Sequence, residues 1–572
     1  MRDGTRVVDH LIEAVAALGV RHLFGVDGAN IEDVYDAVFD YNAAHQGEQL
    51  TAVVAKHEFS AATMADGCAR STAGLGVVMA TSGGGAVNLV AGLAESFAAR
   101  VPVLAIVGQP PTVLEGKGAF QDSSGRAGAF DAVRLFTPIT RYCARVESPA
   151  DLPARLHEAA AAALGGGPAV LLLPKDIQQA ELTDAPVFRP PARRHRTDDY
   201  GLARVRRALH QARATGKIVI IAGDQVARDD ARVELARLAT LLDAAVGVGP
   251  EAKDVYDHDA PGYCGVAGSM GHPELLDAVH RAALCLLIGT RMPVTSRAGM
   301  EAALGAIPVA SIGAETPFVP GLHAHSTDLA TALTGLCEAL PCGPAESTDS
   351  MSATRSERTP LTVLEVPPSD GPGLRYREIV EIVNSVVPEG SDVFADAGNT
   401  GASVVHHLRV PRGGRFTVAL GMGGMGYAFG AGIGSAFARR RRADGRVRRT
   451  FVIAGDGAFL MHGLEVHTAI EYRLPVTFLV FNNNAHAMCV SREQLFYGDR
   501  YSYNRFRPAH PAAGMAAMFP GLCAHSPATR TELAAALRHC VDTEGPSFVA
   551  VDCDPDELPP FTPFLTAPRR LP

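Results

Sequence analysis

Short apolar runs alternate with amphipathic segments along the whole chain, and this pattern is typical of parallel α/β domains. The first third begins with a helical pattern over 7–18, followed by expected strands at 22–26, 51–55, 76–80, 103–107 and 169–173. The middle third shows apolar runs at 217–222, 284–289 and 308–312. The last third repeats the alternation, with expected strands at 393–395, 416–419, 451–454 and 476–481. We therefore predict an α/β fold of three doubly wound parallel-sheet domains.

Two stretches rich in proline and charge interrupt this alternation and predict the domain boundaries. They cover residues 183–200 and 341–373. A chain of 572 residues is too long for one hydrophobic core and is expected to form about three domains. We expect a first domain over 1–182, a middle domain over 190–340, a mobile linker over 341–373 and a last domain over 374–572.

A strand–helix–strand crossover in the last domain places polar side chains where two strands end. The first strand runs into Asp456, a helical pattern with Leu460, Leu464, Val466 and Ile470 follows, and the second strand ends in three asparagines at 482–484. The carboxyl ends of parallel strands meet at one edge of a sheet, where ligands collect. Carboxylate and amide oxygens suit Mg²⁺, which often shares its ligands with a phosphate group. The sequence therefore predicts a magnesium and diphosphate site at this edge.

The spacing of these residues resembles a known motif. Asp456 and Asn483 lie 483 − 456 = 27 residues apart and bracket a Leu-Pro-Val turn at 474–476. This resembles the metal and diphosphate motif of the thiamin-diphosphate enzymes of the acetolactate synthase and pyruvate oxidase kind. The resemblance implies Mg²⁺ ligands at Asp456, Asn483 and the carbonyl of Ala485, with cofactor contacts at Gly455, Gly457, Ala458 and Met488.

A second motif lies in the first domain, around Glu58. This residue follows an expected strand and opens a helix, where the helix dipole alone favours a carboxylate. The surrounding segment, which starts KHEFSAATMADGCARST and continues through TSGGG, resembles the pyrimidine-binding domain of the same family. The resemblance implies that Glu58 hydrogen-bonds the cofactor's pyrimidine ring and promotes its imino tautomer.

The glycine-rich run over 421–426 leaves a rival interpretation open. It contains G-x-G-x-x-G, which can indicate a dinucleotide-dependent oxidoreductase. That fingerprint also needs an acidic residue about 20 positions further on, at the end of the next strand. Asp444 instead falls in a polar, arginine-rich loop. The family resemblance implies that Gly423 offers its carbonyl to the cofactor, Met425 supports its bent shape, and Asn399 and Thr400 contact the diphosphate.

Loops of the first domain are expected to select the substrate. Phe120 and Gln121 match a Phe-Gln pair of acetolactate synthases, and the loop with Ala29 and Asn30 resembles benzaldehyde lyase and related acyloin-forming enzymes. Pyruvate decarboxylase-like members carry an aspartate at position 29 and a His-His pair near position 121, and this chain has neither. Acetolactate synthases carry a tryptophan where this chain has Arg492, which either binds an anionic acceptor or faces solvent.

These residues predict a thiamin-diphosphate-dependent carboligase. It would decarboxylate a 2-oxo acid, pyruvate in the first instance, and transfer the acyl group to an acceptor carbonyl, with Glu58, Gln121, Asn30 and Phe120 as catalytic residues. The alternatives are a 2-oxo acid decarboxylase, an acyloin lyase or, from another class, the dinucleotide-dependent oxidoreductase. By the same resemblance the active site lies between subunits of a homodimer or homotetramer. GVAGSMGHP and LLIGTRMPVTSRAG resemble the family's flavin-binding domain, so FAD is an option, although several members bind no flavin.

Composition excludes other classes of partner. A net charge of −9 without a long basic run argues against nucleic acid. No apolar window is long enough to span a membrane, and the chain begins with an amphipathic helix rather than a signal peptide. The ten cysteines are scattered and form no C-x-x-C pair, which favours a reducing compartment and no structural zinc. We expect a soluble cytoplasmic enzyme with small-molecule substrates.

Overall fold

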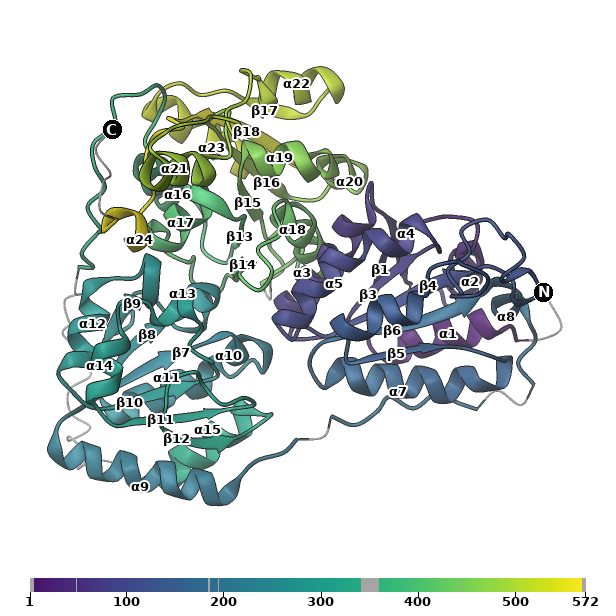
Figure 1. Ribbon diagram of the computed structural model, residues 1–572, viewed down its shortest axis with the longest axis horizontal. Helices are drawn as coiled ribbons and strands as arrows, with labels where there is room; N and C mark the ends of the chain where they lie inside the picture. The colour runs from purple at the N-terminus through teal and green to yellow at the C-terminus, as the bar shows by residue number, and fades with distance from the viewer. Residues whose placement is uncertain are drawn as a thin grey trace.

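Three parallel sheets of six strands each organise the protein. The computed structural model describes residues 5–47, 49–183, 186–193, 195–340, 360–442 and 444–567. Figure 1 shows one sheet in each of three lobes, with helices packed around it. This confirms the predicted α/β class with three parallel-sheet units. Among the described residues, no helix is both long and apolar enough to cross a bilayer.

The first sheet has the strand order β2-β1-β3-β4-β6-β5. Its strands are β1 (His22–Val26), β2 (Thr51–Val54), β3 (Gly76–Ala80), β4 (Val103–Gln109), β5 (Tyr142–Arg145) and β6 (Pro168–Pro174). Its helices are α1 (Val7–Ala17), α2 (Glu32–Ala44), α3 (Glu58–Thr72), α4 (Gly84–Asn88), α5 (Val90–Ala98), α6 (Ala132–Phe136), α7 (Leu152–Leu164) and α8 (Lys175–Gln179). β3, β4 and β6 are buried along their whole length because helices cover both faces.

The middle sheet has the order β12-β11-β10-β7-β8-β9. Its strands are β7 (Lys217–Ala222), β8 (Ala245–Val248), β9 (Tyr263–Val266), β10 (Ala282–Ile288), β11 (Val309–Gly313) and β12 (Leu322–His325). Its helices are α9 (Asp199–Thr215), α10 (Asp224–Arg228), α11 (Arg232–Leu242), α12 (Pro273–His280), α13 (Val294–Arg297), α14 (Glu301–Ala306) and α15 (Leu329–Ala339).

The third sheet has the order β14-β13-β15-β16-β18-β17. Its strands are β13 (Asp392–Ala395), β14 (Phe416–Val418), β15 (Thr450–Gly455), β16 (Val476–Asn482), β17 (Cys523–His525) and β18 (Ser547–Asp552). Its helices are α16 (Tyr376–Val386), α17 (Gly398–His407), α18 (Tyr427–Ala438), α19 (Asp456–His462), α20 (Val466–Glu471), α21 (Ala487–Tyr497), α22 (Pro511–Met518), α23 (Arg530–Asp542) and α24 (Thr562–Leu565).

The helical segment of the predicted crossover is interrupted. A 3-10 turn at 463–465 separates α19 from α20. The ring of Phe459 fills the space that a Cβ at Gly463 would need, so the glycine allows the chain to bend there. Leu460 and Leu464, which belong to the predicted helical pattern, are 60% and 53% exposed, whereas Val466 is buried.

The predicted linker over 341–373 lies partly outside the described residues, which resume at residue 360. Residues 360–373 form no regular element, but they are attached to both neighbouring domains. The backbone N–H of Thr362 donates to Glu274 of the middle domain at 2.8 Å, and Ser369 hydrogen-bonds Asp554 of the third. This described part of the linker therefore runs along the protein surface and is held to it by hydrogen bonds.

The first and third domains meet where α3 crosses α18 (Figure 1). Glycines bring the two helix backbones into direct contact. A Cβ on Gly67 would overlap the backbone of Ala431, and a Cβ on Gly434 would overlap the carbonyl oxygen of Met64. Because α3 begins at Glu58, this crossing fixes where Glu58 lies relative to the third domain.

We expect Gly434→Ala to destabilise this crossing. The added methyl has no free space, and overpacking of this kind costs about 1–3 kcal/mol. A matched control is Gly335→Ala, also within a helix, where a Cβ meets no atom within 4 Å. The control should raise the free energy of unfolding by up to about 1 kcal/mol. Urea unfolding followed by circular dichroism measures both changes. Equal shifts of the unfolding midpoint in the two variants would contradict the close backbone contact between α3 and α18.

Candidate active site

Asp456 and Asn483 lie side by side at the carboxyl edge of the third sheet. β15 and β16 are parallel neighbours with Gly455 opposite Phe481, so the residues that follow both strands emerge at the same edge. β13, the other neighbour of β15, ends at Ala395 and leads into α17 at this edge. The fold therefore brings together the three segments that carry Asp456, Asn483 and Asn399.

Asp456 is a buried carboxylate with unused bonding capacity. It is 3% exposed, and its Oδ1 atom has no hydrogen-bond partner among the described residues. Burial raises the pKa of Asp456 to about 6, an effect that the backbone amides of Gly457 and Asn483 partly offset. A buried oxygen without a partner is costly unless a cation or donor fills the site. This oxygen is therefore well suited to bind a cation.

Asn483 is held in one orientation by its neighbours. Its Nδ2 donates to the hydroxyl of Tyr376 at 2.9 Å, and its Oδ1 accepts from the backbone N–H of Ala485 at 3.0 Å. An amide oxygen has two lone pairs, so one stays available to a cation. Tyr376 is itself buried, stacks on Phe481 and donates its backbone N–H to Glu557. Tyr376 lies 107 residues before Asn483, so no local motif could have revealed it.

Asn399 and Thr400 lie at the beginning of α17 beside Asp456. The side chain of Asn399 donates to the carbonyl of Glu557 at 3.3 Å, while its Oδ1 is buried without a partner among the described residues. Thr400 is buried, and its hydroxyl lies 3.5 Å from the position of a Cβ on Gly455. The start of a helix also presents free backbone N–H groups, which favour an anionic ligand.

Two buried carboxylates hold the glycine-rich loop over 421–426. Asp396 accepts from the backbone N–H groups of Gly426 and Ala428 at 3.0 and 2.9 Å. Glu95, on α5 of the first domain, accepts from those of Gly421 and Met422 at 3.3 and 2.6 Å. Neither anchor could be predicted from the sequence, because these pairs are 30 to 327 residues apart.

The middle of that loop faces the expected cofactor site. Gly423 has a φ of +66°, which favours glycine, and a Cβ there would meet nothing within 4 Å. The Cε of Met425 lies 3.3 Å from the position of a Cβ on Gly457. A Cβ on Gly457 would also lie 2.5 Å from His486 Nδ1, an atom without a partner among the described residues. A side chain at 457 would therefore collide with this part of the site.

Glu58 lies at the beginning of α3. It is buried, and its Oε2 accepts from Asn88 Nδ2 at 2.9 Å. The next residue, Phe59, stacks on His462 with ring centroids 4.3 Å apart, and its ring lies 3.6 Å from the position of a Cβ on Gly424. The structure therefore brings the start of α3 to the 421–426 loop.

Asn30 and Gln121 meet at the hydroxyl of Thr81. The backbone N–H of Asn30 donates to Thr81 Oγ1 at 3.2 Å, and this hydroxyl donates to Gln121 Oε1 at 3.3 Å. A Cβ on Gly85 would lie 2.9 Å from the methyl group of Thr81 and 3.0 Å from Glu58 Oε1. Asn30, Gln121 and Glu58 therefore share one region of the first domain.

The other predicted residues are arranged differently. Phe120 is 77% exposed, and Ala29 is exposed with its carbonyl accepting from Lys175. Arg492 is exposed, and its guanidinium lies over the ring of Phe564 at 5.9 Å. Met488 packs partly against the hydrophobic core, and Ala458 is buried at the start of α19.

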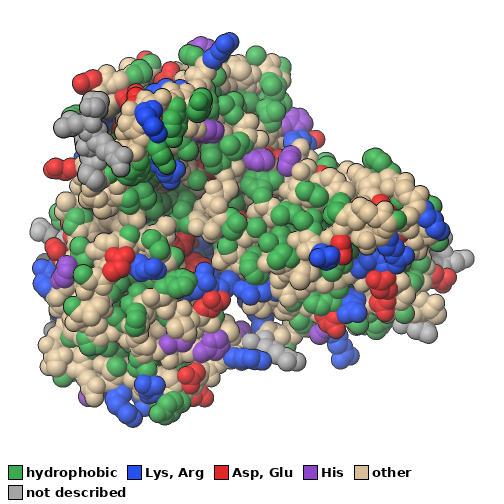
Figure 2. Space-filling view, viewed as in Figure 1, with side chains coloured by type: hydrophobic (Ala, Val, Ile, Leu, Met, Phe, Trp, Pro, Cys, Tyr) green, Lys and Arg blue, Asp and Glu red, His purple; other side chains and the backbone are tan. Residues whose placement is uncertain are grey.

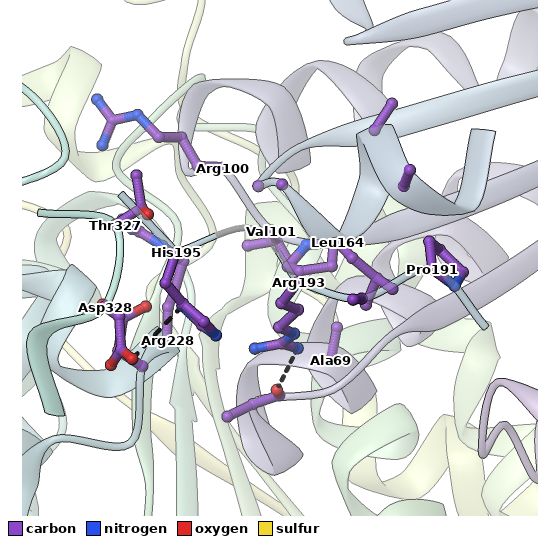
Figure 3. Close-up of a pocket in the computed structure, with 18 of the residues that line it drawn as sticks. Ala69, Arg100, Val101, Leu164, Pro191, Arg193, His195, Arg228, Thr327 and Asp328 are labelled. Atoms are coloured by element: carbon purple, nitrogen blue, oxygen red, sulfur yellow. Dashed lines mark hydrogen bonds and ion pairs between the residues drawn. The ribbon is translucent and has the colours of Figure 1, made fainter. Parts of the chain in front are cut away.

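A cavity of about 780 Å³ lies elsewhere, between the first and middle domains. Figure 2 shows a hollow between these lobes with Lys and Arg side chains at its rim, and Figure 3 shows Arg100, Arg193, Arg228 and His195 around it. His195 pairs with Asp328 at 3.4 Å, and Arg193 donates to the carbonyl of Ala73 at 3.1 Å. None of the predicted site residues lines this cavity. The candidate active site is therefore separate from this cavity and is identified by the chemistry of its residues.

Comparison with known proteins agrees with this geometry. Profiles of the thiamine pyrophosphate enzyme family match the N-terminal TPP binding domain over 5–127, the central domain over 202–312 and the C-terminal TPP binding domain over 396–551. The chain belongs to this family. The predicted resemblance is thereby confirmed, and the three matched regions contain Glu58, strands β7 to β10 of the middle sheet, and Asp456.

The relatives of this thiamine pyrophosphate enzyme align over most of its length. The probable acetolactate synthase large subunit of Methanocaldococcus jannaschii is 28% identical, covering 97% of this chain and 93% of the relative. The acetolactate synthase isozyme 2 large subunit of Escherichia coli K12 is 26% identical, covering 95% of this chain and 95% of the relative. A crystal structure of a proposed thiamin diphosphate-dependent enzyme from Mycobacterium smegmatis superposes with a TM-score of 0.77 at 21% identity, covering 96% of this chain and 99% of the other. It shares the fold.

We expect Glu95→Gln to loosen the glycine-rich loop. The change weakens two hydrogen bonds to backbone N–H groups and removes the charge that pairs with Arg70 at 3.3 Å. Hydrogen bonds to charged groups contribute about 1.5–3 kcal/mol, so the free energy of unfolding and the affinity for thiamin diphosphate should both fall. The exposed Glu158→Gln, which also loses an arginine partner, is the control and should change stability by no more than about 0.5 kcal/mol. Equal cofactor affinity in both variants would show that Glu95 does not position the loop.

Proposed function

We propose that this chain is a thiamin-diphosphate-dependent carboligase of the acetolactate synthase kind. It removes CO₂ from a 2-oxo acid, with pyruvate as the first candidate, and joins the remaining acyl group to the carbonyl of a second molecule. One observation carries the proposal. The 421–426 loop lies against Gly457, the neighbour of Asp456, and against Phe59, the neighbour of Glu58, in a chain aligned over nearly its whole length with an acetolactate synthase relative.

The residues at the third sheet fit a diphosphate and Mg²⁺. Asp456 offers an unpartnered carboxylate oxygen, Asn483 an amide oxygen with a spare lone pair, and Ala485 a backbone carbonyl. Mg²⁺ commonly takes one or two protein oxygens and completes its shell with phosphate and water. We propose these three residues as its ligands, with Asn399, Thr400, Gly423, Met425, Gly455, Gly457, Ala458 and Met488 around the cofactor. When bound, thiamin diphosphate supplies the electron sink that makes loss of CO₂ from a 2-oxo acid feasible.

We propose that Glu58 holds the proton that the cofactor's pyrimidine ring must exchange. Its buried carboxylate is oriented by a hydrogen bond from Asn88 and has Oε1 directed toward Gly85. A positioned acid–base group near its partner accelerates proton transfer by about 10²–10⁴-fold. The same burial excludes water, which would otherwise compete for the proton.

The loops around Gln121 favour joining the acyl group to a second carbonyl over protonating it to release an aldehyde. Gln121 and Asn30 present neutral amides, which orient a carbonyl without delivering a proton. The nearby carboxylates of Asp122 and Asp131 already accept from backbone N–H groups of Gly116, Ser124 and Arg134. Asp122 and Asp131 therefore offer no free acid that would protonate a carbon nucleophile formed here. This favours attack of the nucleophile on a second carbonyl. Phe120 and Arg492 remain proposed contacts to the acceptor.

We propose a homodimer or homotetramer with the active site at a subunit interface. Phe120 and Met422 are 77% and 61% exposed, and Leu460, Met461 and Leu464 are also mostly exposed. Exposed apolar side chains grouped near a ligand site indicate a surface that another chain covers. The proposal keeps the expected three-domain boundaries and a cytoplasmic location. It assigns no redox role to FAD, because decarboxylation followed by ligation transfers no electrons to an acceptor cofactor.

The proposal predicts coupled products and a requirement for Glu58. Wild-type protein with thiamin diphosphate, Mg²⁺, pyruvate and a panel of carbonyl acceptors should release one CO₂ for each ligated product detected by mass spectrometry. Glu58→Gln should lower kcat by about 10²–10⁴-fold. Glu13→Gln, on the exposed face of α1, is the control and should leave kcat unchanged.

Two results would contradict this account. Wild-type rates in Glu58→Gln would remove the proton-transfer role of Glu58. Accumulation of free aldehyde without any ligated product would identify a 2-oxo acid decarboxylase instead.

A further inference from the structure

Two cysteines and two histidines converge at the far edge of the third sheet. Cys523 and His525 are the first and last residues of β17, and His539 and Cys540 lie in the last turn of α23. The Sγ of Cys523 lies 3.3 Å from His525 Nε2 and 3.8 Å from His539 Nδ1. The two histidine nitrogens are 3.1 Å apart. The donor atoms of Cys523, His525 and Cys540 all lie within 4.8 Å of one another.

We propose that Cys523, His525, His539 and Cys540 form a binding site for Zn²⁺. Tetrahedral zinc has Zn–S bonds of about 2.3 Å and Zn–N bonds of about 2.0–2.1 Å, which separate its ligand atoms by about 3.3–3.8 Å. The three separations among the donor atoms of Cys523, His525 and His539, 3.1, 3.3 and 3.8 Å, fall in or just below this range, and the Sγ of Cys540 lies within 4.8 Å of the donor atoms of Cys523 and His525. Sites with two cysteines and two histidines are a common structural zinc arrangement.

The chemistry of the donors favours a thiophilic ion over Mg²⁺. All four ligand atoms are nitrogen or sulfur, which suit Zn²⁺, whereas Mg²⁺ requires oxygen. Cys540 is fully buried, and a thiol must release its proton when it binds Zn²⁺.

A buried arginine compensates the charge that thiolates would introduce. Arg449 is buried near Cys523 and Cys540. Its guanidinium is fixed by the hydroxyl of Thr477 at 3.1 Å and by the carbonyls of Thr543 and Gly545. Two thiolates and two neutral imidazoles would bring a charge of −2 to Zn²⁺, and the adjacent guanidinium places a positive charge beside them. The site therefore has a neighbour matched to its ionised form.

The position of the cluster points to a structural role. β17 has three residues and forms the outer edge of the sheet beside β18, which separates it from β16 and the candidate active site (Figure 1). Residues i and i+2 of a strand face the same side, so Cys523 and His525 both face α23. An ion would fasten this short edge strand to the last turn of the helix. The sequence-based expectation of no structural zinc did not identify this cluster. Its Cys-x-His pair ends at His525 and its His-Cys pair begins at His539, and this separation of 539 − 525 = 14 residues matches no common zinc-site spacing.

Metal binding to the full-length protein tests the site. Protein purified under reducing conditions and stripped with a chelator would be titrated with Zn²⁺ against a chromogenic chelator, and with Co²⁺ for its absorption spectrum. We expect one Zn²⁺ per chain, a tetrahedral thiolate spectrum with Co²⁺, and a higher Tm with the ion bound. Changes to residues beside a metal ligand lower metal affinity by about 10–100-fold. Loss of a ligand itself should have a larger effect, so Cys523→Ser and His539→Ala should each lower the affinity for Zn²⁺ by more than about 100-fold. His539 is exposed, so its variant should fold normally.

Cys143→Ser is the matched control. Cys143 is a half-buried cysteine on the outer strand β5 of the first sheet. The Cys143→Ser variant should therefore bind Zn²⁺ with the affinity of the wild type. Equal Zn²⁺ affinity in the wild type, Cys523→Ser and His539→Ala would overturn the proposal. A Cys523–Cys540 disulfide in protein that retains no zinc after reduction would also overturn it. Neither outcome depends on the carboligase activity.

Discussion

The backbone contact between α3 and α18 is the constraint on which the candidate active site depends. Gly67 and Gly434 let two helices from different domains approach without side chains between them. This contact sets the position of Glu58, the first residue of α3, relative to the loop that leads into α18. Side-chain packing alone would allow rotamer changes to shift the two halves, whereas backbone contact is rigid. The glycines are therefore needed for the geometry of the site as well as for packing.

Buried carboxylates in this region differ in how their oxygens are used. Burial raises the pKa of both Asp396 and Asp456 to about 6. Asp396 accepts hydrogen bonds at both oxygens from the backbone of the 421–426 loop and the start of α18. Asp456 retains an oxygen with no partner among the described residues. The first carboxylate is satisfied by the protein and holds structure, and the second is available to a ligand.

The sequence predicted the parts of the site that are encoded locally. Asp456, Asn483 and Glu58 could be placed because each follows an apolar strand, and parallel strands deliver their carboxyl ends to one edge. Glu95, Asp396 and Tyr376 were missed as anchors because their partners are remote in sequence and are joined to them only by the fold. The break between α19 and α20 was missed because it depends on how the ring of Phe459 packs. The position of Arg492 over Phe564 likewise follows from tertiary packing.

Calorimetric titration of the metal-free protein with thiamin diphosphate, with and without Mg²⁺, tests the central claim most directly. The account predicts binding that requires Mg²⁺ and is lost in Asp456→Asn, with no binding of NAD under the same conditions. Binding of NAD without any binding of thiamin diphosphate would contradict the assignment of the Asp456 and Asn483 edge as a diphosphate and magnesium site.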